Sequence, residues 1–170
     1  MKKIVLYILL SGVLLASGCG GGIEPEPERP IQMGFGGTVT FTGTWNPDIM
    51  RVHLVVFRSP LNSVADFNPF NLAFVSDSIP IGATTWSYNT NENKISDIFN
   101  LTAGSYAYAA VAFSTTPDLA LDRGAWFVVG VYRATGDTAS VSPVVIPEGQ
   151  FVSGVNIFCD FDNPPPQPPE

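Results

Sequence analysis

The sequence has little of the residue types on which most active sites and nucleic-acid interfaces are built. Among 170 residues there are one histidine, two cysteines and eight lysines and arginines, and the formal net charge is −7. Zinc needs three or four nitrogen or sulfur ligands, which His53 and Cys159 cannot supply. Because no stretch concentrates lysine or arginine, neither nucleic acid nor an anionic membrane surface is expected as a partner.

No hydrophobic run is long enough to span a bilayer, which takes about 20 apolar residues. The longest N-terminal run covers residues 4–15, preceded by Lys2 and Lys3 and followed by the small residues at 16–18. A short positive segment, an apolar segment and small residues together form the layout of a cleavable secretory signal. We therefore expect residues 1–18 to be a signal peptide.

Cys19 follows this segment directly and precedes three glycines. The stretch "LASGC" resembles a bacterial lipobox, although Ala16 stands where most such boxes carry leucine and Leu15 lies one place earlier. The resemblance implies that the mature chain begins at Cys19, with diacylglycerol on its thiol and usually an acyl group on its amine. More than one acyl chain gives stable anchoring. The alternative is an ordinary signal peptide with a cysteine in this position by chance.

The residues after Cys19 bear on where the anchored protein lies. An Asp directly after the cysteine would resemble the inner-membrane retention signal of enterobacteria, but this position holds Gly20. We therefore expect the protein to be anchored in the cell envelope at the outer membrane, with its domain facing either the periplasm or the surface. Glycine gives flexibility, and alternating Glu and Pro at 24–28 favour an extended chain. Residues 19–30 are thus expected to form a tether.

The remainder of the chain is large enough for one domain, from residue 31 to 163. Charged residues make up 14% of the sequence, while glycine and proline are plentiful at 16 and 15 residues. This composition favours short strands and turns over helices. The tail at 164–170, "PPPQPPE", is expected to be extended polyproline.

Alternating or continuously apolar segments separated by Gly and Pro turns predict about seven to nine strands and no helix. The fold expected is all-β, a single antiparallel Ig-like or transthyretin-like β-sandwich. The segments at 104–113 and 125–134 are apolar on both faces and should be central. The expected strands are 37–45, 50–58, 72–81, 84–89, 94–101, 104–113, 125–134, 138–146 and 151–161.

Two segments resemble the carboxypeptidase-regulatory-like and transthyretin-like sandwich domains. Leu101, Gly104 and Tyr106 match a leucine, a glycine turn and a tyrosine that opens a strand. The matches in the C-terminal segment are Val144, Gly149, Val152, Gly154, Val155 and Ile157. The resemblance implies an accessory or binding module without catalysis, and residues 59–90 have no counterpart in it.

The residues that could carry chemistry favour structural roles. His53 is expected as a solvated or half-buried strand residue, and Cys159 as a small buried hydrophobe. Asp66, Asp118 and Asp122 are read as solvated loop acids, since no calcium-loop pattern is present. No GxSxG, HExxH, CxxC or phosphate-binding glycine motif occurs. We therefore predict no catalytic residue, no metal and no cofactor.

Aromatic residues near strand ends offer one candidate ligand site. Trp45, Trp86 and Tyr88 could present ring faces to a sugar, as in carbohydrate-binding sandwiches. The alternative is that these rings pack into the core, as sandwiches commonly bury Trp and Tyr.

The sequence as a whole predicts a membrane-anchored bacterial lipoprotein that is not an enzyme. Its β-sandwich is interpreted as a binding or assembly module in the cell envelope, with the membrane as a partner through the lipid and an envelope protein or a glycan as a further partner. A carbohydrate-binding surface lipoprotein using Trp45, Trp86 and Tyr88 is the alternative. A hydrolase using Asp118 and Asp122 is the third hypothesis.

Replacement of Cys19 by serine tests the anchor. Cells fed labelled palmitate should label the wild-type chain, and Cys19→Ser should lose that label because the thiol that carries diacylglycerol is absent. The measurement is the radiolabel or click signal on the immunoprecipitated chain. Equal labelling of both forms would refute the lipobox reading, and protease shaving of intact cells would separate surface from periplasmic exposure.

Overall fold

The computed structural model describes residues 32–134 and 140–170. The predicted signal peptide, Cys19 and the tether lie outside the described residues. Within the described ranges, no helix is long and apolar enough to cross a membrane.

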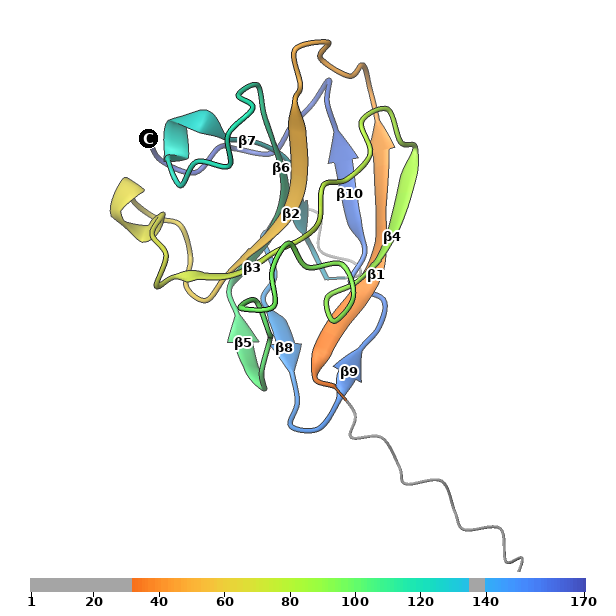
Figure 1. Cartoon of the computed structure of the whole chain (residues 1–170), viewed down its shortest axis with the longest axis vertical. Coiled ribbons are helices and arrows are strands. Elements are labelled where there is room, and N and C mark those ends of the chain that lie inside the picture. The colour runs from red at the N-terminus through yellow and green to blue at the C-terminus, as the bar shows by residue number, and fades with distance from the viewer. Residues whose placement is uncertain (1–31, 135–139) are drawn as a thin grey trace, which may run out of the picture.

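The described residues form an almost wholly β structure, as the sequence predicted (Figure 1). Two short 3-10 turns, η1 (Val64–Asp66) and η2 (Arg123–Ala125), lie in the connections. The strands are β1 (Gly34–Thr42), β2 (Arg51–Phe57), β3 (Leu72–Val75), β4 (Thr85–Asn89), β5 (Gly104–Tyr106), β6 (Tyr108–Ser114), β7 (Phe127–Tyr132), β8 (Val144–Ile146), β9 (Phe151–Val152) and β10 (Ile157–Asp160).

One curled sheet of eight strands carries the fold, in the order β3-β2-β6-β7-β10-β1-β4 with β9 pairing β1. The strands β5 and β8 form a separate two-stranded sheet. The expectation of a purely antiparallel arrangement is wrong, because β1 runs parallel to both β9 and β10. Val39 lies opposite Ile157 in the β1–β10 pair, so the last strand closes against the first.

The segment after β4 links the two edge strands of this sheet. The amide of Asp77, just beyond β3, donates to the carbonyl of Asn93, and the amide of Ile95 donates to the carbonyl of Val75. At the other end of the segment, Thr90 donates to the carbonyl of Phe35 in β1. These bonds pair part of the β3 edge within the chain, and an edge that is paired is less available for pairing with another chain.

Strands β2, β6 and β7 are buried on both faces, which explains their continuous apolar sequences. One face joins the main core inside the curled sheet, with Val52 and Val111 among its members. The other face forms a second apolar cluster, made of Phe57, Tyr108, Ala110, Ala112, Trp126, Val128 and Val131. The prediction that 104–113 and 125–134 contain central strands is confirmed by β6 and β7.

Several strand predictions differ from the structure. Residues 94–101 form turns and bends, and the predicted strands at 104–113 and 151–161 are each divided in two, into β5 and β6 and into β9 and β10. The predicted strand at 72–81 ends with β3 at Val75, and within the described part of 138–146 only β8 is a strand. The division at 104–113 allows β5 to leave the main sheet and pair with β8. Turn residues such as Asn93 and Asn100 favour local side-chain hydrogen bonds over a ladder, and both make such bonds here.

Tyr106 fixes the corner at which β5 begins. Its hydroxyl accepts from the amide of Thr102 and donates to the carbonyl of the same residue, both at 3.0 Å. The ring is 3% exposed and belongs to the main core. The side chain therefore anchors the turn before β5 to the core.

Gly130 in β7 allows close packing against β10. A Cβ at this position would lie 2.5 Å from Cys159 Sγ and 2.6 Å from the Phe158 carbonyl oxygen. Cys159 is fully buried here, as expected, and burial raises the pKa of its thiol. A side chain at 130 would therefore push two strands apart.

We expect Gly130→Ala to lower the free energy of unfolding by about 1–3 kcal/mol, the usual range for overpacking a core. Gly124→Ala is the matched control, since the nearest atom to its added Cβ lies 3.9 Å away. Urea unfolding followed by tryptophan fluorescence gives both values. Equal midpoints for the two variants would contradict the close packing of β7 on β10.

Candidate ligand-binding site

A cavity of about 170 Å³ lies over the second apolar cluster, on the outer face of the central strands. Its sheet side is formed by apolar residues of β2, β3, β6 and β7: Val55, Phe57, Leu72, Ala112 and Val128. The opposite side comes mainly from three segments without strands, and Phe99 adds to it from the segment between β4 and β5. These segments decide whether the site exists, because the sheet alone would leave a flat apolar surface.

The first covering segment is the loop at 59–71, which contains Pro60 and Pro69. Asp66 holds it in shape, as its carboxylate accepts from the amide and hydroxyl of Ser63. These bonds lower the pKa of Asp66. The loop places Phe67 5.5 Å from Phe57, measured between ring centroids, so its apolar side packs on the sheet.

The second covering segment runs from 117 to 126 and contains η2. Asp122 caps η2 by accepting from the Gly124 amide. The indole nitrogen of Trp126 donates to the carbonyl of Ala120 at 2.7 Å. The segment thereby folds back on itself and adds Leu119, Leu121 and Trp126 to the cavity wall.

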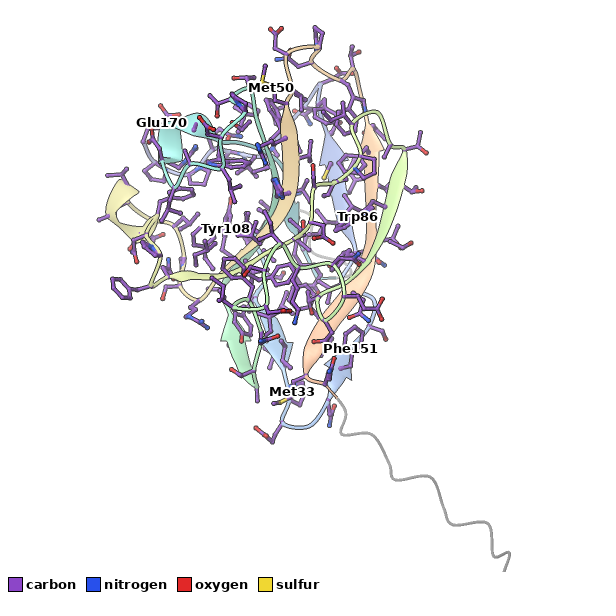
Figure 2. The ribbon with its side chains drawn as sticks, viewed as in Figure 1. Met33, Met50, Trp86, Tyr108, Phe151 and Glu170 are labelled. Carbon is purple, nitrogen blue, oxygen red and sulfur yellow. The ribbon has the colours of Figure 1, made fainter. Side chains whose placement is uncertain are left out.

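The third covering segment is the proline-rich tail. The side-chain amide of Gln167 donates to the Val128 carbonyl and accepts from the Val128 amide, at 2.9 and 2.8 Å. Pro168 is buried and accepts a hydrogen bond from Arg123 Nη2 at 2.9 Å. The prolines of the tail have no N–H group to donate to β7, so the side chain of Gln167 makes the hydrogen bonds to Val128 that a neighbouring strand would make. Figure 2 shows Glu170 beside the η2 segment.

Exposed apolar side chains gather in the segments around the cavity. Phe70, in the first covering segment, is 91% exposed, and Ile98, which precedes the wall residue Phe99, is 81% exposed, although neither lines the cavity. Leu119 and Leu121, each 45% exposed, are themselves part of the wall. An apolar rim on an apolar cavity is typical of a binding site and costs free energy in water.

Arg123 is a buried cation in this apolar wall. The residue is 4% exposed, and two of its N–H groups donate to the carbonyls of Trp126 and Pro168. Its Nε has no hydrogen-bond partner. No carboxylate of the described residues forms an ion pair with Arg123. The ion pair found among the described residues joins Lys94 and Asp97.

A second cavity of about 210 Å³ adjoins the first, and the two share the wall residues Leu61, Tyr108 and Pro168. Arg133 lines the second cavity, and its Nε also has no hydrogen-bond partner. Burial raises the pKa of the Tyr108 hydroxyl to about 12, against the positive charges of Arg123 and Arg133, which favour ionisation. Both guanidinium groups therefore act on the junction between the cavities.

His53 is buried at 1% exposure, so the expectation of a solvated or half-buried residue is wrong. The second covering segment lies over it, and its ring is 5.9 Å from that of Trp126. Nδ1 donates to the Ser76 carbonyl at 2.9 Å, which leaves Nε2 as an acceptor without a partner. Burial lowers the pKa of His53, and the ring is neutral.

The predicted aromatic site lies elsewhere. Trp86 stacks on Tyr88 with ring centroids 5.4 Å apart, while Trp45 packs against Phe41 and Phe161. Tyr88 is 6% exposed, and its hydroxyl donates to the Val155 carbonyl; burial raises its pKa. Figure 2 shows Trp86 and Tyr108 on opposite sides of β2 in this view. None of Trp45, Trp86 and Tyr88 lines the cavity.

The loop acids proposed for hydrolysis are exposed. Asp118 carries no capping role, and Asp122 is occupied with the η2 cap. Across the part of the chain that the structure describes, no cluster of three His, Cys, Asp or Glu side chains could hold a metal ion.

No protein-family model matches the sequence, no curated protein is significantly similar to it, and no solved structure matches its fold. The function of this chain is therefore inferred from its own geometry. Sequence reasoning missed Arg123, Arg133 and Tyr108. One signal was available, since Arg123 and Arg133 stand at the two ends of the apolar run at 125–132 in a chain with few basic residues.

The buried neutral histidine makes stability depend on pH. Below about pH 6.5 the unfolded chain binds a proton at His53, while the folded state, with its lowered pKa, does not. The free energy of unfolding should therefore fall as pH drops below 6.5, by up to about 1.4 kcal/mol per pH unit. Urea titrations from pH 7.5 to 5 measure this slope. His53→Gln should flatten it, and an unchanged slope in that variant would contradict the assignment.

Proposed function

We propose that this chain is a lipid-anchored protein of the bacterial cell envelope whose β domain binds an apolar ligand without catalysis. The lipidated Cys19 and the tether at 19–30 would hold the domain at the outer membrane, facing the periplasm or the surface. The observation that carries the proposal is the cavity over the outer face of β2, β6 and β7, walled by apolar side chains and rimmed by exposed ones.

The size and chemistry of the cavity support binding. An apolar cavity of about 150 Å³ is large enough for benzene, so 170 Å³ admits one ring or a short stretch of alkyl chain. The partly exposed wall residues Leu119 and Leu121 offer further apolar surface to the part of a ligand that does not fit inside. A membrane anchor would keep such a site close to lipid.

The wall composition supports binding over turnover. Its polar side chains are Arg123 and Tyr108, and neither a carboxylate nor an imidazole lines it. General acid–base or nucleophilic catalysis needs such a group within hydrogen-bonding reach of the substrate. The exposed Asp118 and Asp122 lie outside the wall.

We also propose that the fold is a variant of the Ig-like, transthyretin-like sandwich, related to the carboxypeptidase-regulatory-like domains. The Tyr106 hydroxyl bonded to the backbone of Thr102 supports this relation, since a tyrosine corner of this kind recurs in Greek-key sandwiches. The parallel pairing of β1 with β10 is the main departure from a purely antiparallel sandwich.

A neutral photoreactive probe tests the site in the full chain in membrane vesicles. A ten-carbon primary alcohol with a terminal diazirine should label peptides that contain the wall residues Leu119 and Trp126, mapped by mass spectrometry. Ala120→Leu adds three carbons to the wall and should reduce this labelling at least fivefold, because the cavity loses its free volume.

Ala65→Leu is the matched control, since Ala65 is exposed and outside the wall. It should label as the wild type does. Labelling that is spread evenly along the chain, or unaffected by Ala120→Leu, would overturn the proposed binding site.

A further inference from the structure

The two adjoining cavities differ in chemistry, and the difference specifies a ligand. This inference rests on the proposed binding function. The first cavity is apolar almost throughout, whereas the second is lined by Arg133 and Gln167 as well as by the prolines of the tail. A molecule that fits both must be apolar at one end and polar at the other.

The polar end fits an anion, because neither Arg123 nor Arg133 forms an ion pair with a carboxylate of residues 32–134 and 140–170. An unpaired buried charge costs several kcal/mol unless an opposite charge or hydrogen bonds compensate it. Arg123 is buried, with two backbone acceptors and an unpartnered Nε, whereas Arg133 is half-buried and only its Nε is both buried and unpartnered. Acidic residues outnumber basic ones 15 to 8, so the chain has carboxylates that could pair with these arginines, yet none of the described ones does so.

Tyr108 marks where the two ends of the ligand meet. It lines both cavities, and the charges of Arg123 and Arg133 both act on its hydroxyl. A phenol can donate to a carboxylate or phosphate oxygen, and arginine binds both anions through charge-assisted hydrogen bonds.

We propose that the paired cavities bind an amphiphile with one alkyl chain and an anionic head. The alkyl chain occupies the apolar cavity against Phe57, Val128 and Trp126 and continues over the exposed rim. The head lies at the junction beside Tyr108, between Arg123 and Arg133. Carboxylate and phosphate heads share this chemistry, as in a free fatty acid and a single-chain phospholipid.

The test compares the diazirine fatty acid of ten carbons with the neutral alcohol of the same length, on the full chain in vesicles. Arg133→Gln should raise the half-saturating concentration of the acid about tenfold, because a charge-assisted interaction is lost. The same variant should change the value for the alcohol less than twofold. The half-saturating concentration of each probe is compared only between variants, so the different partition of the acid and the alcohol into the bilayer does not affect the result.

Arg58→Gln is the matched control, since Arg58 is exposed and lines neither cavity, and it should leave both probes unchanged. Arg123→Gln should act as Arg133→Gln does, and thermal unfolding confirms that each variant is folded. Competition by decanoate against decyl phosphate identifies the preferred head.

The outcomes separate this inference from the proposed function. Pocket labelling by both probes with no selective effect of either arginine variant would overturn the anionic head and leave the apolar site intact. Absence of labelling at the wall by either probe would overturn both. A selective loss of the acid in both arginine variants supports the amphiphile.

Discussion

The double-sided burial of β2, β6 and β7 is the constraint on which the rest of this structure depends. Three neighbouring strands with apolar residues on both faces are unstable when either face is exposed to water, because each Å² of exposed apolar surface costs about 25 cal/mol. The curled sheet covers one face by wrapping around the main core, continued beyond β7 by β10, β1 and β4. The other face needs a second layer, and this chain supplies it from loops and the tail.

A layer made of irregular segments packs differently from a second sheet. Its backbone groups have no strand ladder and need individual hydrogen-bond partners. The side chains of Asp66 and Asp122 accept from backbone amides, and the side chain of Gln167 donates to the Val128 carbonyl. Side chains from such segments do not interdigitate in regular rows as those of two facing sheets do. The cavity lies in the space that remains between the regular layer and the irregular one, so the way the fold is completed also creates its candidate site.

This division explains what could be predicted from the sequence. Periodicity located β1, β2, β4, β6 and β7, and continuous apolar character identified the central strands, because both signals come from a regular layer. The covering segments have no period. Nothing in "TTPDLALDRGAW" indicates that Leu119 and Trp126 face the same cavity as Phe67, and for the same reason His53 was expected to be solvated although the segment at 117–126 covers it.

The parallel pairing of β1 with β10 could not be predicted from the sequence, for a related reason. A strand pattern reports burial and length but not direction, and β1 meets β10 across more than a hundred residues of sequence. Gly130 and Gly37 are informative in retrospect, because each lies where another backbone approaches too closely for a Cβ. A glycine inside an apolar strand can mark such a contact, but it does not identify the strand that makes it.

The arginines connect the architecture to the proposed ligand. Arg123 is well placed for a structural role, since its bonds to Trp126 and Pro168 join two covering segments to each other. A neutral donor could make those two bonds without the cost of burying a charge. The same reasoning applies to the unpartnered Nε of Arg133 across the shared wall. Charge is what distinguishes arginine from such a donor, and the anion proposed at the junction beside Tyr108 would give that charge a partner.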